Sequence, residues 1–220
     1  MDPLATLLAQ IEEGFDETAI AMAEADPELL SARAENGLRP ALSALYAGRR
    51  DLAHELANLT RDLDVHEAAA LGRLERMEAF AGSPGIGSHA PDGFTPLHLA
   101  AFFSHPSVVD WLLEHGADPS AEARNGSGLR PLHSALAGRD ERAAFQIAAA
   151  LLVRGADVDA RQNGGYTSLH AAAKRGSGTL AELLLGAGAD PALRTDQDQS
   201  AADLAAAGGH HLLAERLRGL

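Results

Sequence analysis

A tetrapeptide ending in histidine recurs along this chain at steps of about 33 residues, and it constrains the fold more than any other feature. It reads Thr95-Pro96-Leu97-His98, then Arg130-Pro131-Leu132-His133, then Thr167-Ser168-Leu169-His170. The histidines lie 35 and 37 residues apart, and a matching Ser200-Ala201-Ala202-Asp203 follows with Asp203 33 residues after the third histidine. Self-similarity at such a step is typical of a solenoid, in which each unit packs only against its neighbours.

The residues that follow each tetrapeptide predict a pair of helices. A Thr or Ser before Pro favours a helix start, because its side chain caps the first turn and Pro lacks only an N–H that would be unpaired there. Each unit ends in Gly-Ala-Asp, at Gly116, Gly155 and Gly188, where glycine suits the left-handed position after a helix. With 46% hydrophobic but only 4% aromatic residues, the core is built mostly from Ala and Leu, so we expect an all-α chain.

These features occur together in fixed order three times, and in this the chain resembles the ankyrin-repeat family. Its richness in Ala, Arg and Gly favours a bacterial source. The resemblance implies an all-α ankyrin-repeat solenoid of stacked helix–turn–helix units with hairpin-like loops, about six to seven in number. In the third unit we align His66 with His98. We expect one domain over 1–220, divided into a degenerate N-terminal cap (1–36), two degenerate repeats (37–63 and 64–93), three clear repeats (94–128, 129–164 and 165–198) and a C-terminal capping repeat (199–220).

Two irregularities interrupt the pattern. The segment 81–92 is rich in Gly, Ser and Pro, which predicts a long flexible connection. The fifth unit has 22 residues from its motif histidine to its glycine, whereas its neighbours have 18, so about four residues are inserted around 138–144. The insertion is either one extra helical turn or a loop that contacts a partner.

Composition and charge exclude several classes of function. The chain has 18 Lys and Arg against 31 Asp and Glu, a formal charge of −13, which repels nucleic acids and anionic membranes. It has no cysteine, which excludes disulfides and thiolate metal sites. The residues Met1–Glu13 lack the features of a secretory signal, and no apolar run reaches the roughly 20 residues that span a bilayer. We therefore expect a soluble, cytoplasmic monomer.

The ten histidines raise the question of metal binding or catalysis. The resemblance implies that His98, His133 and His170 hydrogen-bond the backbone between adjacent loops. Packed helices lie roughly 10 Å apart, so these rings cannot share a zinc ion at bond lengths of roughly 2 Å. The chain contains no P-loop, nucleophile elbow or H-E-x-x-H motif. We expect no catalytic residues, no cofactor and no metal.

The resemblance also implies where a partner protein binds, namely on the concave face made by the loops and the inner helices. Four of the nine aromatic residues fall on that face, and aromatic and Arg side chains anchor many interfaces. Either Phe102 or Phe103 has an alternative role, filling a gap beside the irregular third unit, and Trp111 is expected in the core or on the convex face. The predicted partner-binding residues are Asp92, Phe94, Phe102, Phe103, Arg124, Leu129, Arg139, Tyr166, Lys174, Arg175 and Gln199.

Several of these residues are basic, and in an acidic chain they suit an acidic partner segment. Scattered, solvated arginines explain the same pattern equally well. The function expected is a non-catalytic scaffold that binds a protein partner through the concave face. The alternative is an inhibitor or immunity-type subunit of an enzyme encoded nearby, and a secreted host-directed effector or an enzyme is less favoured.

Overall fold

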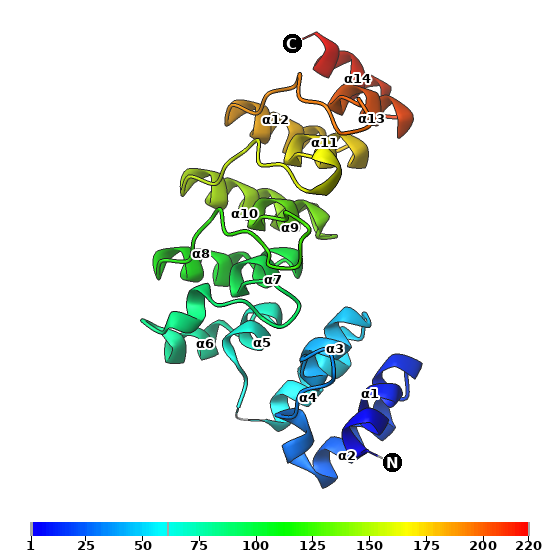
Figure 1. Ribbon diagram of the computed structural model, residues 1–220, viewed down its shortest axis with the longest axis vertical. Helices are drawn as coiled ribbons and strands as arrows, with labels where there is room; N and C mark the ends of the chain where they lie inside the picture. The colour runs from blue at the N-terminus through cyan, green and yellow to red at the C-terminus, as the bar shows by residue number, and fades with distance from the viewer. Residues whose placement is uncertain (1, 61, 220) are drawn as a thin grey trace.

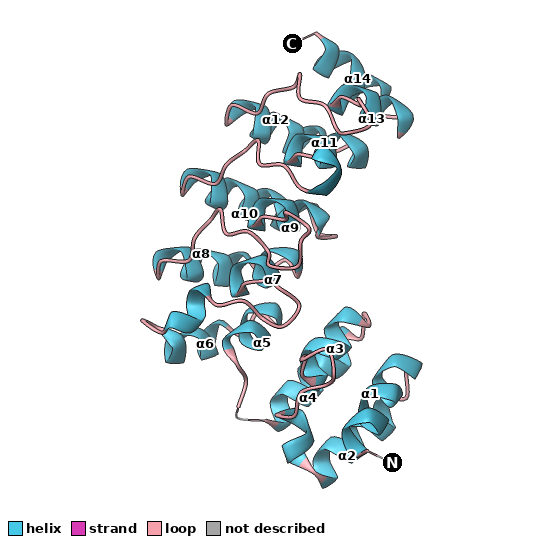
Figure 2. Ribbon diagram, viewed as in Figure 1, coloured by secondary structure: helices cyan, strands magenta, loops and turns pink. Residues whose placement is uncertain are grey.

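The computed structural model describes residues 2–60 and 62–219. Fourteen α-helices lie in these residues, and Figure 2 shows loops and turns between them with no strand in the described part. The helices form seven consecutive pairs, one in each of the seven predicted units. The all-α solenoid predicted from the repeat is confirmed, at the upper end of the expected number of units. None of the described helices is both long enough and apolar enough to cross a membrane.

The first helix of each pair is called the inner helix and the second the outer helix. The inner helices are α1 (Pro3–Glu13), α3 (Pro40–Tyr46), α5 (Val65–Ala70), α7 (Pro96–Phe102), α9 (Pro131–Ala137), α11 (Ser168–Arg175) and α13 (Ala201–Ala207). The outer helices are α2 (Asp16–Ala25), α4 (Arg50–Leu59), α6 (Leu74–Met77), α8 (Pro106–Glu114), α10 (Glu141–Val153), α12 (Gly178–Gly186) and α14 (His211–Arg218). Short 3-10 turns are η1 (Pro27–Leu30), η2 (Glu78–Phe80), η3 (Pro84–Gly87) and η4 (Asn163–Gly165).

The pairs are stacked, and the stack changes direction near its N-terminal end. Figure 1 shows the pairs from α5 to α14 one above another, whereas α1 to α4 lie to one side of α5 and α6. Two buried clusters correspond to these parts of the chain. Ala70, Leu71, Leu99 and Phe103 belong to the N-terminal cluster although they come from the third and fourth units. These four side chains therefore join the two parts.

Small residues let the inner helices approach closely, as the sequence predicts. Ala100, Ala101, Ala172 and Ala173 have no exposed surface. On the outer side of the stack, Trp111 is 7% exposed, and it packs in the core as expected. Its ring stacks on His115 with centroids 3.8 Å apart, and its Nε1 donates to Glu78 Oε1 at 2.9 Å.

The insertion in the fifth unit is one helical turn. Helix α10 has 13 residues, whereas α8 and α12 have nine each. The connection between α9 and α10 is only Gly138–Asp140, the same length as the connection between α7 and α8. The interpretation as a contact loop is wrong, because four residues extend the apolar face of a helix by a full turn without changing its direction.

The segment 81–92 is packed rather than a free connection. It contains η3, which the hydroxyl oxygen of Ser83 caps by accepting from the N–H of Gly85 at 3.1 Å. Ile86 is 4% exposed and belongs to the larger buried cluster. The prediction of a flexible connection fails because one apolar side chain, surrounded by turn residues, is enough to hold the segment against the core.

Candidate functional site

The three motif histidines bind backbone carbonyls of the loop that leads from their own helix pair to the next inner helix. The Nε2 atom of His98 lies 3.2 Å from the carbonyl oxygen of Leu129. The corresponding distances are 3.0 Å from His133 to Ala160 and 3.2 Å from His170 to Gln199. The structural role implied by the resemblance is confirmed for all three.

The second nitrogen of each ring is also occupied. The N–H of Thr95 donates to Nδ1 of His98 at 3.3 Å, so Nε2 carries the proton that Leu129 accepts. Burial lowers the pKa of His98 to about 4, which keeps the ring neutral. A neutral ring with both nitrogens engaged has no lone pair to offer a metal or a substrate proton. No cluster of three or more metal-binding side chains occurs among the described residues.

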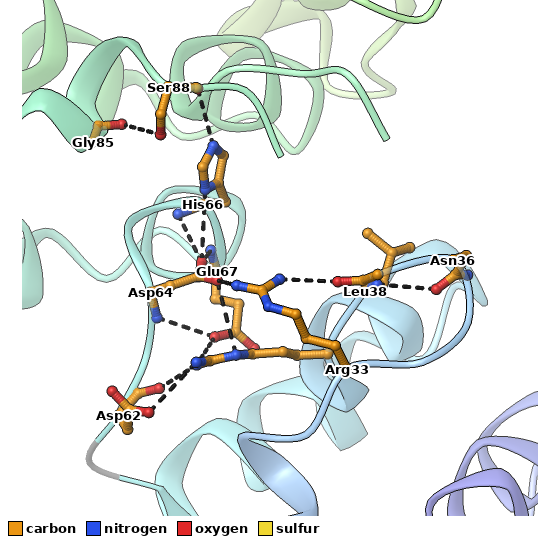
Figure 3. A network of polar contacts seen from close by, with 11 residues as sticks. Arg33, Asn36, Leu38, Asp62, Asp64, His66, Glu67, Gly85 and Ser88 are labelled. Atoms are coloured by element: carbon orange, nitrogen blue, oxygen red, sulfur yellow. Dashed lines mark hydrogen bonds and ion pairs between the residues drawn. The ribbon is translucent and has the colours of Figure 1, made fainter. Parts of the chain in front are cut away.

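The third unit departs from the sequence alignment, and Figure 3 shows the polar contacts of Asp64, His66 and Glu67 there. Asp64 caps α5 by accepting from the N–H of Glu67 at 2.9 Å, and Glu67 accepts in return from the N–H of Asp64 at 3.1 Å. In α7 the same reciprocal pair is Thr95 and His98. Glu67 therefore holds the motif position, and the alignment of His66 with His98 is wrong by one residue.

His66 nevertheless reaches the next loop, since its Nε2 lies 3.1 Å from the carbonyl oxygen of Ser88. Glu67 instead forms an ion pair with the preceding unit, with its Oε2 3.1 Å from Arg39 Nη1. Burial raises the pKa of Glu67 to about 7, and the negative charge of Asp64 adds to the rise. This network joins the second unit to the third.

An apolar cavity of about 200 Å³ lies on the inner-helix side of the stack, between the second, fourth and fifth units. Tyr46, at the end of α3, and Phe102, at the end of α7, are part of its wall, and each is 41% exposed. The rest of the lining is Phe94, His98, Leu99, Leu129, His133, Ser134 and Ala137. Two half-exposed aromatic rings beside an apolar hollow form a surface that can hold an apolar side chain.

Several predicted residues meet at this cavity. Phe94, Phe102 and Leu129 line it. Asp92 accepts a hydrogen bond of 2.7 Å from the hydroxyl of Tyr46, which fixes that ring in the wall of the cavity. The structure thus brings together residues that the sequence analysis assigned to three separate loop and helix positions.

Two predicted residues are engaged in contacts within the chain. Phe103 is 8% exposed and packs into the N-terminal cluster, in an edge contact with Phe102 at 5.0 Å. This burial favours the alternative role of a gap-filling residue over that of a partner contact. The guanidinium of Arg175 donates to the carbonyl oxygens of Leu136 and Gly138, the first at 3.2 Å. Arg175 braces two inner helices, so its charge is already engaged.

The other predicted residues lie farther along the stack. Tyr166 is half-buried, with its ring centroid 6.1 Å from that of His170. Lys174 is exposed at the end of α11. Gln199 is half-buried and offers its carbonyl oxygen to His170. Arg124 is exposed on the loop between α8 and α9, beside a separate cavity. None of these lines the apolar cavity, so they remain separate predictions.

Arg139 lies beside a second cavity, of about 390 Å³, that shares Phe102 and Ala137 with the apolar one. Sequence reasoning missed Tyr46 and Arg50, which line the two cavities on the N-terminal side. A signal was present, because Tyr46 follows Pro40 by six residues, as Phe102 follows Pro96. Aligning the two prolines places both aromatic rings at the same point of an inner helix.

The comparisons with known proteins agree with this architecture. Family models described as ankyrin repeats in three copies match residues 6–122 and 65–162, and a model of ankyrin repeats in many copies matches 151–205. Ankyrin repeats are in general non-catalytic modules for protein–protein interaction. Enzymes can contain them, since a palmitoyltransferase of Lachancea kluyveri is 30% identical over 138 residues, 61% of this chain and 18% of that protein.

Two further relatives match a larger share of this chain. The neurogenic locus notch homolog protein 2 of Homo sapiens is 33% identical over 172 residues, 73% of this chain and 6% of that protein. The NF-kappa-B inhibitor delta of Mus musculus is 29% identical over 212 residues, 82% of this chain and 57% of that protein. In each case the chain spans less than two thirds of the relative. Family models and fold together show that this chain belongs to the ankyrin-repeat family.

Proposed function

We propose that this chain is a non-catalytic scaffold that binds one protein partner through the inner-helix surface around the apolar cavity. The observation that carries the proposal is the pair of aromatic rings at its edge, Tyr46 and Phe102, each 41% exposed beside a hollow lined almost only by apolar atoms. Exposed aromatic side chains at the rim of a hollow are the usual anchors of protein interfaces.

The formal charge of −13 supports a protein rather than a nucleic acid or an anionic membrane as the partner. The engaged motif histidines support a role without a metal or a cofactor. We further propose that the chain acts as a monomer in the cytoplasm, because each unit of a solenoid is completed by its neighbours in the same chain.

The experiment compares two variants that each lose one exposed phenyl ring. Phe102→Ala removes a ring at the cavity, whereas Phe145→Ala removes a ring that is 37% exposed on the outer helix α10. Each tagged variant is purified from its source cells, and bound proteins are quantified by mass spectrometry. The proposal expects partners to be lost with Phe102→Ala and kept with Phe145→Ala. Equal recovery by both variants contradicts it.

A second candidate function is inhibition of an enzyme or regulator by masking. Similarity to a protein named as an inhibitor, over 82% of this chain, favours it. The test is the activity of the recovered partner with and without the purified chain. Inhibition at stoichiometric amounts supports this function, whereas binding without any change in activity leaves the scaffold function alone.

A further inference from the structure

Two arginines lie next to the apolar cavity without a carboxylate partner. Arg50, at the start of α4, and Arg139, between α9 and α10, line the second cavity. Neither guanidinium forms an ion pair or a side-chain hydrogen bond with any residue that the structure describes. Other arginines in the chain do form such pairs, for example Arg49 with Asp16 at 2.6 Å. Within the described residues Arg142 and Arg154, on α10 and at its C-terminal end, also lack such a pair, so Arg50 and Arg139 are distinguished by their place beside Phe102.

The second cavity contains more positive than negative charge. Arg50, Arg139 and Asp140 line it, and the carboxylate of Asp140 caps α10 by accepting from the N–H of Ala143 at 3.0 Å. Beside Tyr46 the charged partner is instead a carboxylate, because Asp92 accepts from the Tyr46 hydroxyl. Two guanidinium groups and one carboxylate thus lie next to Phe102, and a carboxylate lies next to Tyr46.

The size of the apolar cavity limits what it can hold. Its volume of about 200 Å³ is below the range of roughly 300–1,000 Å³ that is typical of sites for cofactors and small-molecule ligands. An apolar cavity of about 150 Å³ can hold a molecule of benzene. The cavity therefore has room for one large apolar side chain of a partner.

We infer that the partner presents a peptide segment in which one bulky apolar side chain is followed or preceded, within about three residues, by Asp or Glu. The apolar side chain enters the cavity between Tyr46 and Phe102, and the carboxylate binds Arg50 and Arg139. The carboxylate lies beside Phe102 because two guanidinium groups outnumber Asp140 there, whereas the charged group bound to Tyr46 is the carboxylate of Asp92. This inference rests on the proposed function and specifies the chemistry of the partner.

The test uses a random 12-residue peptide library displayed on phage, selected against the full chain. The strongest peptide is then synthesised with a fluorescent label, and its dissociation constant is measured by anisotropy. Three chains are compared with wild type: Phe102→Ala, the double variant Arg50→Glu/Arg139→Glu, and a control double variant Arg142→Glu/Arg154→Glu. The control makes the same change of charge on α10 and its C-terminal end, at exposed residues that line neither cavity.

We expect the selected peptides to share a large apolar residue with an acidic neighbour. Binding should weaken by about tenfold or more in Phe102→Ala and in the Arg50/Arg139 variant, and by less than about twofold in the control. Replacing the acidic residue of the peptide with its amide should weaken binding to wild type but not to the Arg50/Arg139 variant.

Two results would overturn the inference in different ways. Binding that depends on Phe102 but not on Arg50 and Arg139 refutes the acidic segment and leaves the proposed surface intact. Selected peptides that bind all variants equally refute the cavity as the peptide site, and the proposed function is then judged separately by the recovery of cellular partners. Self-association that depends on Phe102, measured by sedimentation, would identify a second copy of the chain as the occupant and also overturn the inference.

Discussion

Arg39 Nη1 and Glu67 Oε2 lie 3.1 Å apart, in an ion pair that joins the second helix pair to the third. The side chain of Glu67 is 2% exposed and that of Arg39 is 12% exposed. Loss of water from a buried carboxylate opposes the attraction between the charges. Burial, with the charge of Asp64 adding to it, raises the pKa of Glu67 to about 7. The joint between these units therefore contains a carboxyl group that titrates near neutral pH.

Replacing Glu67 with Gln should remove this titration. A carboxyl with a folded-state pKa above its usual 4.5 stabilises the fold below pH 4.5, and this stability is lost as the pH rises through 7. For so buried a group the loss is roughly 3 kcal/mol. The difference in unfolding free energy between wild type and Glu67→Gln should fall by that amount from about pH 4.5 to about pH 8. Urea denaturation measures it, and a difference independent of pH would contradict the assignment.

His98 should have the opposite pH dependence. Burial lowers its pKa to about 4, so the stability it contributes is present above pH 6.5 and is lost as the pH falls toward 4. His98→Ala should lower the unfolding free energy by roughly 3 kcal/mol at about pH 7.5, because it leaves buried backbone groups unpaired. The variant should also lose less stability on acidification than wild type. His211→Ala, at an exposed position, serves as the control and should change neither quantity.

Gly155→Val should destabilise the chain through backbone strain alone. Gly155 has φ of 87°, a conformation that side chains with a Cβ rarely adopt, and no atom lies within 4 Å of the Cβ position. The expected cost is roughly 2 kcal/mol. The control is Gly186→Ala, at a position where φ is not positive and the space is also open. Its unfolding free energy should stay the same or rise by up to about 0.5–1 kcal/mol. Equal thermal stability of the two variants would show that the turn does not require glycine.

The regular units could be predicted from sequence because their signals are local. Thr95, Pro96 and Gly116 each favour a conformation that depends on their own chemistry, and the structure uses all three as expected. The third unit misled the alignment because Glu67 can cap a helix as His98 does. Only the hydrogen bonds distinguish Glu67 from His66 as the motif residue.

Which aromatic residue is exposed depends on packing between distant units. Phe102 and Phe103 are adjacent and chemically identical, yet the first is 41% exposed and the second 8%. The change of stacking direction after α4 covers Phe103 with the N-terminal cluster. The sequence contains no local signal for this change, so the choice between the two rings could not be made from it.

Phe103→Ala and Phe102→Ala should therefore separate stability from binding. Phe103→Ala should lower the unfolding free energy by roughly 3–4 kcal/mol, because it leaves a cavity in the N-terminal cluster. Phe102→Ala should cost less than about 1 kcal/mol, because much of that ring is already in water. Urea denaturation of the two variants measures the difference. If Phe102→Ala were the less stable of the two, the assignment of the rings would be reversed.

The central claim, that a partner protein lies over the cavity between Tyr46 and Phe102, can be tested in the source cells by site-specific photo-crosslinking. Benzoylphenylalanine in place of Phe102 keeps a phenyl ring at the cavity. The same residue in place of Val153, which is 84% exposed at the end of the outer helix α10, is the control. We predict a crosslinked protein from position 102 and none from position 153. A crosslink from position 153 without one from position 102 would contradict the account.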